Sequence, residues 1–339
     1  MKKLVFGLRL LAAVVTIVSI YVFAPWQTAL YWLTPLPDSI QQEIDHAVDE
    51  GLVGMMVYVN TKDGPPEFYA GGWFNRETNT PATPHALFKI ASIGKLYDAA
   101  AVVKLSAAGV LNLDNTLADY LPVHSKHIEN AARITLRMML QHRSGIPNFT
   151  DADGFTWGEP ITEPLALIIG KPALFEPDTD YAYSNTNYLL LQMIMSQELG
   201  YFYWHYIEQE LLRPLGLSNT FHSVNAIDTA QLMSGYYVGY QEDVKHLDQG
   251  YIATAEDVGI FVRALNEGTF FSDDEMQIYQ AVYEFGHTGW VLGYYSIARY
   301  HNDIDAVIVQ FVNINGGDIT WQANVTYDRI TDIIRKRDE

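Results

Sequence analysis

The chain is organised around the stretch Leu87–Lys95, which reads LFKIASIGK and ends in a serine and a lysine three positions apart. A helical pattern follows from Leu96 to Leu105, so we expect Ser92 and Lys95 on one helical face, about one turn apart. A serine is a weak nucleophile until a neighbouring base takes its proton, and a partly desolvated lysine can be that base. A helix start also offers free N–H groups that can stabilise an oxyanion. Taken alone, the pair is more simply explained by a helix cap and an exposed lysine.

The elements expected around this stretch define a fold. A helix over Ser39–Glu50, with Ser39 and Gln42 as a capping box, precedes two short strands over Met55–Val59 and Glu67–Trp73. Periodicity then predicts helices at 96–105, 136–140 (capped by Thr135), 187–199, 202–212 and 255–265, strands at 284–291, 294–300 and 306–313, and a terminal helix from Asp318 to about Arg335. The early and late strands combine most simply in one antiparallel sheet. We therefore predict an α/β fold of the α+β type, with helices flanking the sheet and a large inserted all-helical region.

Composition narrows the classes of protein. The 339 residues include 49% hydrophobic and 18% charged residues, which excludes a disordered or fibrous chain. The net charge of −19 argues against nucleic acid as a partner. The chain has no cysteine, which excludes disulfides, thiolate metal sites and a cysteine nucleophile. His124 and His127 lack a third ligand in the sequence, so we expect neither a metal nor another cofactor.

The N-terminal segment predicts export. Two lysines precede an apolar run from Leu4 to Ala24 that contains one charge, Arg9, and no good cleavage site because Pro25 follows. The next aromatic residues suit a membrane interface: Trp26, Tyr31 and Trp32. We expect residues 1–36 to form a membrane anchor or signal segment with a linker, an uncleaved anchor being favoured. Residues 37–339 should form one domain outside the cytoplasm, on the periplasmic or cell-surface side, with the sheet from about 37–90 and 282–339 and the helical region from about 91–281.

Two further polar clusters lie where the chain turns. Tyr183-Ser184-Asn185 precedes a helix, and there a tyrosine hydroxyl could relay a proton while an asparagine amide orients a carbonyl group. His287-Thr288-Gly289 lies in the first late strand, where glycine lets a ligand approach the strand edge. Each cluster also has a simpler explanation. The first could be a helix cap, and the second an incidental histidine beside a strand glycine.

Together and in this order, the three clusters resemble the motifs of the penicillin-recognising serine hydrolases, in the branch of class C β-lactamases, D,D-carboxypeptidases and related esterases. The pattern S-x-x-K, Y-x-N and K/H-T/S-G is matched by the following residues: Ser92 with Lys95, Tyr183 with Asn185, and His287 with Thr288 and Gly289. Flanking segments resemble family segments as well, at 88–92, 113–122, 140–147, 175–177, 213–217, 254–257 and 286–289. The resemblance covers roughly residues 40–335.

The resemblance implies a role for each of these residues. Ser92 would be the nucleophile that forms an acyl-enzyme, while Lys95 and Tyr183 share the proton transfers. The backbone N–H groups of Ser92 and Trp290 would form the oxyanion hole. Substrate would be bound by the remaining motif residues: Asn185, His287, Thr288 and Gly289.

The third motif limits the substrate. His287 stands where β-lactamases of this branch carry lysine, and a neutral imidazole attracts a substrate carboxylate less than an ammonium does. Arg299 is a weak candidate for binding that carboxylate. We expect an exported serine hydrolase acting on a small-molecule or peptide substrate such as a cell-wall peptide, at D-Ala-type peptide or related amide and ester bonds, as a D,D-carboxypeptidase or β-lactamase does. An esterase of the same fold and a non-catalytic member that binds peptidoglycan or a partner protein are the alternatives.

Overall fold

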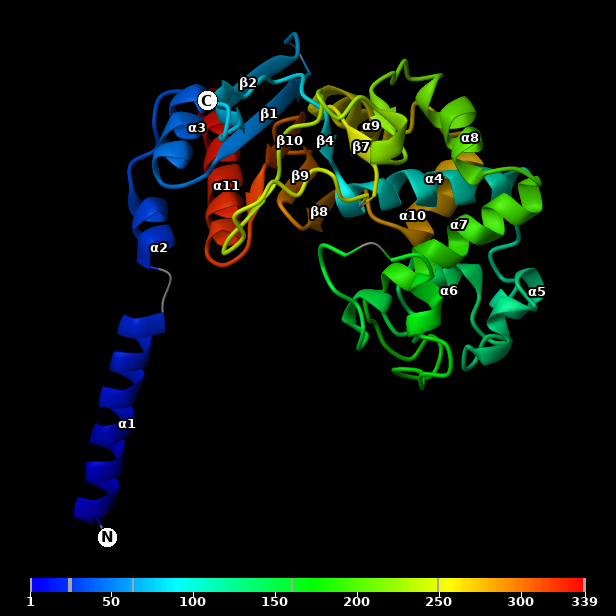
Figure 1. The fold of residues 1–339 in the computed structure, drawn as a ribbon, viewed down its shortest axis with the longest axis horizontal. Helices are drawn as coiled ribbons and strands as arrows, with labels where there is room; N and C mark the ends of the chain where they lie inside the picture. Colours follow the sequence, from blue (N-terminus) through cyan, green and yellow to red (C-terminus); the bar gives the residue numbers. More distant parts are fainter. Residues whose placement is uncertain (1, 24–25, 63, 160, 249, 338–339) are drawn as a thin grey trace.

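A six-stranded antiparallel sheet forms the centre of the computed structural model, which describes residues 2–23, 26–62, 64–159, 161–248 and 250–337 (Figure 1). Its strand order is β3-β2-β1-β10-β9-β8. The strands are β1 (Gly54–Thr61), β2 (Glu67–Asn75), β3 (Thr80–Pro81), β8 (His287–Val291), β9 (Tyr294–His301) and β10 (Ala306–Val312). Early and late strands lie side by side because β1 pairs with β10, with Tyr58 opposite Val309. The predicted fold class is therefore confirmed.

Helices cover both faces of the sheet. The sequence of β10, AVIVQFV, is buried along its whole length, as expected for a strand packed on both sides. On one face, α3 (Ile40–Asp49) and α11 (Ile319–Arg337) pack against Val57 and Ile308. On the other face, α9 (Ala255–Glu267) packs against Tyr58 and its neighbours. Alternate residues of β1 thus enter two different cores, which follows from the two-residue period of a strand.

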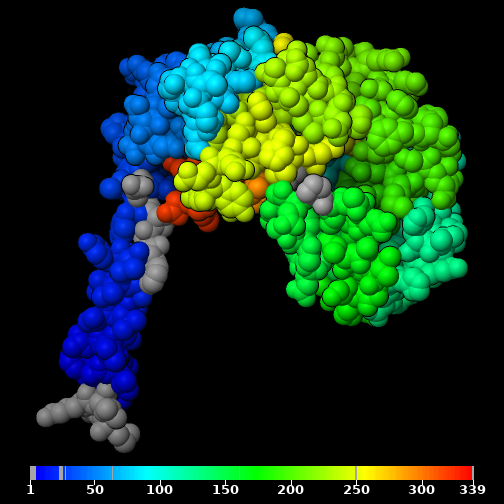
Figure 2. Space-filling model, viewed as in Figure 1, coloured from blue at the N-terminus to red at the C-terminus, as the bar shows by residue number. Residues whose placement is uncertain are grey.

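The inserted region is mainly helical. Its helices are α4 (Gly94–Ala107), α5 (Leu117–Tyr120), α6 (Leu136–Leu140), α7 (Asn185–Leu199), α8 (Tyr203–Ile207) continued by the π turn η5 (Glu208–Leu212), and α10 (Asp273–Val282). Short 3₁₀ turns connect them: η1 (Ala91–Ile93), η2 (His124–His127), η3 (Phe149–Asp151), η4 (Pro164–Leu167) and η6 (Val224–Ala226). Two-residue strands form two small additional sheets. One contains β4 (Phe88–Lys89), β7 (Ile252–Ala253) and β5 (Thr220–Phe221). In the other, β6 (Tyr236–Tyr237) pairs with β11 (Ile314–Asn315) from the C-terminal part of the chain. Figure 2 shows this region, largely green, beside the sheet region across a concave edge of the molecule.

Three local features differ from the sequence analysis. The helix α10 was not predicted, although Ser272 and Glu275 form a capping box at its start. The first late strand begins at His287 rather than at Glu284. At α3, Ser39 Oγ accepts from the Gln42 N–H at 3.3 Å, but the Gln42 side chain accepts from the N–H of Asp38 instead of Ser39.

The N-terminal helix stands apart from the domain. Within α1 (Lys2–Phe23), the 18 residues Val5–Val22 have a mean hydropathy of 2.2 and none is buried, so α1 is long and apolar enough to cross a membrane. Figure 1 shows α1 projecting away from the sheet, while α2 (Trp26–Leu33) lies against α11. Ala24 and Pro25, where the sequence analysis found no good cleavage site, lie outside the described residues.

Candidate active site

Ser92 lies in the single 3₁₀ turn η1, between β4 and α4. The preceding Ala91 has φ = 50°, a left-handed conformation that is uncommon for a residue with a Cβ and is found where surrounding contacts hold the backbone. The turn packs against the edge strand β8 at Gly289, where a Cβ would lie 2.2 Å from the carbonyl oxygen of Ile90. Only glycine permits this approach. The contact brings the third sequence motif beside the serine.

Lys95 occupies the first turn of α4 with its amine at the serine. Its Nζ donates to Ser92 Oγ at 3.0 Å and to Asn185 Oδ1 at 2.8 Å. Burial lowers the pKa of Lys95 to about 8, and the nearby Asp98 carboxylate counteracts part of that shift. Near neutral pH an appreciable fraction of the amine is therefore uncharged, and an uncharged amine can accept a proton from the serine.

Asp98 was not identified from the sequence. It lies one turn after Lys95 on α4, is buried, and accepts hydrogen bonds from Tyr251 Oη and, at 2.9 Å, from Gln192 Nε2. Burial raises the pKa of Asp98 to about 6, so the group is still mainly ionised at pH 7. Its i,i+3 spacing from Lys95 places both on one helical face, and this spacing was the available sequence signal.

Tyr183 reaches Ser92 from the segment that precedes α7. Its hydroxyl donates to Ser92 Oγ at 2.8 Å, and burial raises the pKa of Tyr183 to about 12. The phenol is therefore protonated at pH 7 and can pass a proton on. Its ring stacks on the imidazole of His142 with a centroid distance of 4.3 Å. Burial lowers the pKa of His142 to about 3, so this supporting ring is neutral.

The segment from His142 to Asn148 holds the second motif in position. The N–H of Ser184 donates to His142 Nδ1 at 3.1 Å, and the N–H of Asn185 donates to Asn148 Oδ1 at 3.0 Å. The Asn185 side-chain amide also donates to Asn148 Oδ1, at 3.3 Å, which leaves its Oδ1 for the Lys95 ammonium. Asn148 thus fixes the orientation of a predicted site residue. The sequence analysis gave it no role, because its partner lies 37 positions away.

The side chain of His287 is almost fully buried at the start of β8. Burial lowers the pKa of His287 to about 4, so the imidazole is neutral at pH 7. It contacts the carbonyl of Thr288, and its Nε2 lies 3.2 Å from Glu284 Oε1. Because a neutral imidazole has a single N–H, it can donate to only one of these two acceptors at pH 7. Burial also raises the pKa of Glu284.

The remaining predicted residues lie around this centre. Thr288 and Gly289 follow on β8, and Trp290 packs its ring against Trp157, with a centroid distance of 5.1 Å, and against Tyr237 at 6.2 Å. The backbone groups predicted to form the oxyanion hole thus belong to the adjoining η1 and β8. Arg299, on β9, points its guanidinium toward the ring of Tyr327 on α11, 6.0 Å from the centroid.

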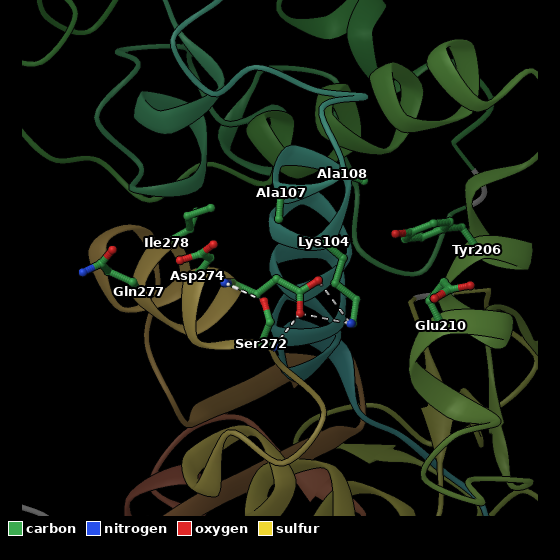
Figure 3. A pocket seen from close by; sticks show the side chains of 10 residues that line it. Lys104, Ala107, Ala108, Tyr206, Glu210, Ser272, Asp274, Gln277 and Ile278 are labelled. Carbon is green, nitrogen blue, oxygen red and sulfur yellow. Dashed lines mark hydrogen bonds and ion pairs between the residues drawn. The ribbon is translucent and has the colours of Figure 1, made fainter.

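Two hollows lie on the surface of the described residues. One of about 450 Å³ adjoins the third motif and is lined in part by Glu284, His287, Thr288 and Arg299. A second, of about 660 Å³, lies where the end of α4 meets α10 and the α8–η5 helix, around the Lys104–Glu275 ion pair (Figure 3). None of the predicted site residues lines the second hollow. Among the described residues, no three His, Asp or Glu side chains are grouped to bind a metal ion.

The fold, with Ser92 and Lys95 in contact, agrees with the resemblance to the penicillin-recognising serine hydrolases. The Beta-lactamase family model matches residues 40–283, and the chain belongs to that family. This confirms the resemblance found in the sequence.

Solved structures with a similar fold include two amide hydrolases. The D-amino acid amidase from Ochrobactrum anthropi SV3 is 22% identical, with a TM-score of 0.78, over 88% of this chain and 98% of that one. The D-stereospecific amidohydrolase from Streptomyces sp. is 19% identical, with a TM-score of 0.73, over 84% of this chain and 96% of that one. At these identities the likeness concerns the fold.

Curated relatives match a shorter part of the chain. Protein flp of Staphylococcus aureus (strain N315) is 29% identical over 196 residues, 55% of this chain and 39% of the relative. Penicillin-binding protein 4* of Bacillus subtilis (strain 168) is 26% identical over 180 residues, 51% of this chain and 38% of the relative. The chain therefore spans about two fifths of the length of the curated relatives it matches.

Proposed function

We propose that this protein hydrolyses amide bonds through an acyl-enzyme on Ser92. One observation carries the proposal: Ser92 Oγ is within hydrogen-bonding distance of both Lys95 Nζ, at 3.0 Å, and Tyr183 Oη, at 2.8 Å. A nucleophile that contacts a base of lowered pKa and a second proton carrier is the arrangement that serine-based acyl transfer needs.

In the acylation step, uncharged Lys95 takes the proton of Ser92 while Oγ attacks the carbonyl carbon. The oxyanion is stabilised by the backbone N–H groups of Ser92 and Trp290. When the C–N bond breaks, Tyr183 gives its proton to the leaving nitrogen and is reprotonated from Lys95. A water molecule then attacks the acyl carbonyl and gives a proton to Lys95, and Ser92 Oγ leaves and recovers its proton. The net reaction consumes one amide and one water, and yields an acid and an amine.

For the substrate we propose an uncharged carboxyl derivative of a D-amino acid, such as its amide, bound by Asn185 and the His287-Thr288-Gly289 strand. His287 is neutral at pH 7, so its imidazole offers a free carboxylate less attraction than an ammonium would. The aromatic rings of Trp290 and Trp157 beside the third motif suit an apolar side chain. The amidase and the amidohydrolase that share the fold act, by their names, on D-configured substrates.

We further propose that the protein is exported and that α1 anchors it in a membrane. The 18-residue segment Val5–Val22, with Arg9 as its one charge, has the length and hydropathy of a membrane span, and two lysines precede it at the N-terminus. By the preference for positive charge on the cytoplasmic side, the domain lies on the other side.

Intact-protein mass spectrometry of the full chain in detergent tests the nucleophile. A fluorophosphonate is expected to add one adduct to the wild type, whereas a penicillin, which carries a free carboxylate, should label it weakly or not at all. Neither should label Ser92→Ala, while Ser106→Ala, altered at another serine of the same helix region, should be labelled as the wild type is. Labelling of Ser92→Ala at the wild-type level would overturn the proposal. A wild type that is folded and unlabelled by both reagents would favour a non-catalytic binding protein.

Hydrolysis assays separate the substrate classes. We expect D-phenylalanine amide to be cleaved faster than L-phenylalanine amide and faster than a peptide ending in a free D-Ala carboxylate. A preference for the free carboxylate would favour a D,D-carboxypeptidase, and cleavage of esters alone would favour an esterase.

A further inference from the structure

We propose that α2 is a fixed part of the folded domain and lies in the surface of the bilayer, where it holds the domain against the lipid. The proposal rests on the membrane anchor proposed for α1. It goes further than the sequence analysis, which placed the aromatic residues of this segment at a membrane interface but within an anchor and linker, and a linker would let the domain move freely.

The inner side of α2 is built into the domain. Tyr31 is buried, its hydroxyl donates to the carboxylate of Glu43 on α3, and it lies 3.0 Å from Thr326 Oγ1 on α11. Burial and the neighbouring Glu43 raise the pKa of Tyr31 far above its usual value, so the hydroxyl keeps its proton as a donor. One tyrosine of α2 therefore joins two helices that cover the sheet. The expectation that Tyr31 lies at a membrane interface is wrong, because its side chain is buried in the domain.

A buried arginine secures the chain that follows α2. Arg329 forms a bidentate ion pair with Glu43, in which Nε donates to Oε1 at 2.7 Å and Nη2 donates to Oε2 at 2.9 Å. Its other N–H groups donate to the carbonyls of Thr34, at 2.8 Å, and Pro35, at 3.2 Å. A buried ion pair is stable only if its remaining hydrogen bonds are made. Residues 31–35 make those bonds, so this segment belongs to the folded unit.

The outer side of α2 is apolar and exposed. Trp26, Leu30 and Leu33 follow the i, i+4, i+7 spacing of one helical face and are 47%, 62% and 68% exposed, and the adjacent Trp32 is 63% exposed. No charged residue occurs between Arg9 and Asp38. Large exposed apolar side chains gathered on one helix face mark an interaction site. Tryptophan and leucine on an uncharged helix face suit the boundary between lipid head groups and acyl chains.

The position of α2 in the chain favours lipid as that partner. The membrane-length helix α1 ends at Phe23 and α2 begins at Trp26, so the exposed face starts within three residues of the proposed exit from the bilayer. Figure 1 shows α1 and α2 on the same side of the domain. The helix α11, which contacts α2, also exposes a tryptophan, Trp321, in its first turn.

The absence of cysteine from the sequence allows single-site labelling. The full chain, carrying Leu30→Cys with a polarity-sensitive fluorophore, is reconstituted in phosphatidylcholine vesicles that contain doxyl-labelled lipid. We expect a blue shift and strong quenching at position 30. A label at Leu11, within α1, reports insertion of the anchor. A label at the exposed Val123 of the inserted region is the matched control and should be neither shifted nor quenched.

Each outcome decides one point. A quenched label at Leu11 with an unquenched, water-exposed label at Leu30 would overturn the proposal for α2 and leave the anchor intact. An unquenched label at Leu11 would instead overturn the anchor itself. Pulsed distance measurement between spin labels at Leu30→Cys and at Asp332→Cys on α11 tests the fixed attachment. We expect a narrow distribution in vesicles, and a broad one would show that α2 is a loose linker.

Discussion

Two buried lysines lie on either side of Ser92, each three residues away, and their surroundings differ. Lys89, at the end of β4, donates to the backbone carbonyls of Val244, at 3.2 Å, and Leu247, at 2.6 Å. Lys95, at the start of α4, donates to Ser92 Oγ and Asn185 Oδ1. The first amine thus holds a loop, while the second contacts the proposed nucleophile.

A low lysine pKa does not by itself distinguish the two sites. Burial lowers the pKa of Lys89 to about 7, against the opposing effect of Asp243 and Asp248, and that of Lys95 to about 8. Loss of water on burial lowers the pKa of both amines, but of the two only Lys95 lies beside a group with a transferable proton. A perturbed pKa therefore indicates a catalytic base only together with the contacts of the group.

The largest effect is expected at Lys95. Replacing it by Met removes the proposed base, and kcat/KM for the D-amino acid amide should fall by about 10³ or more. Steady-state kinetics and the rate of fluorophosphonate labelling measure this change, with circular dichroism to check the fold. Lys104→Met is the matched control, because Lys104 lies on the same helix but pairs with Glu275 at 3.3 Å, away from the site. Equal losses in both variants would contradict the role of Lys95.

A smaller effect on activity is expected at Lys89. Lys89→Met leaves two buried carbonyls without their donor, which costs about 1–3 kcal/mol of the free energy of unfolding. The rate should fall about tenfold at most. A loss as large as that of Lys95→Met would remove the distinction between the two lysines.

The pH dependence of stability supplies an independent test of Lys89. Its folded pKa, about 7, lies below the unfolded value near 10.5, so above pH 7 the unfolded chain binds more protons than the folded one. The contribution of Lys89 to the free energy of unfolding therefore rises with pH from about 7 to about 10. Denaturant unfolding at pH 6.5 and pH 9 should show a smaller rise in Lys89→Met than in the wild type. The rise that remains belongs in part to Lys95.

A rise in rate, rather than a loss, is expected at Asp98. Its negative charge raises the pKa of Lys95, so Asp98→Asn should lower that pKa and move the acidic limb of the pH–kcat/KM profile to lower pH. With a pKa of about 8, roughly one amine in eleven is uncharged at pH 7, so the gain at pH 7 is at most about tenfold. Asp114→Asn, at an exposed acid, should leave the limb in place. A shift of the limb to higher pH in Asp98→Asn would show that the carboxylate does not act on Lys95.

Local patterns in the sequence determined much of the fold. The strands β1, β9 and β10 and the helices α3, α7 and α9 fall where alternation, helical spacing and caps place them, because these signals act within a few residues. The first two motifs named Ser92, Lys95, Tyr183 and Asn185, which hydrogen bonds join in the structure. Their chemical roles stay predictions until the variants are measured.

The tertiary structure decided what links distant segments. Asn148 orients Asn185 only because two loops dock, and nothing in the local sequence around either residue indicates that contact. Arg329 lies 286 positions from Glu43, yet their buried pair attaches α2 to the domain. Such contacts depend on which surfaces meet when the helices pack on the sheet. A buried polar group then needs a partner, which can come from any part of the chain. The sequence by itself thus determined the elements and the reactive groups, while packing decided the partners that orient them.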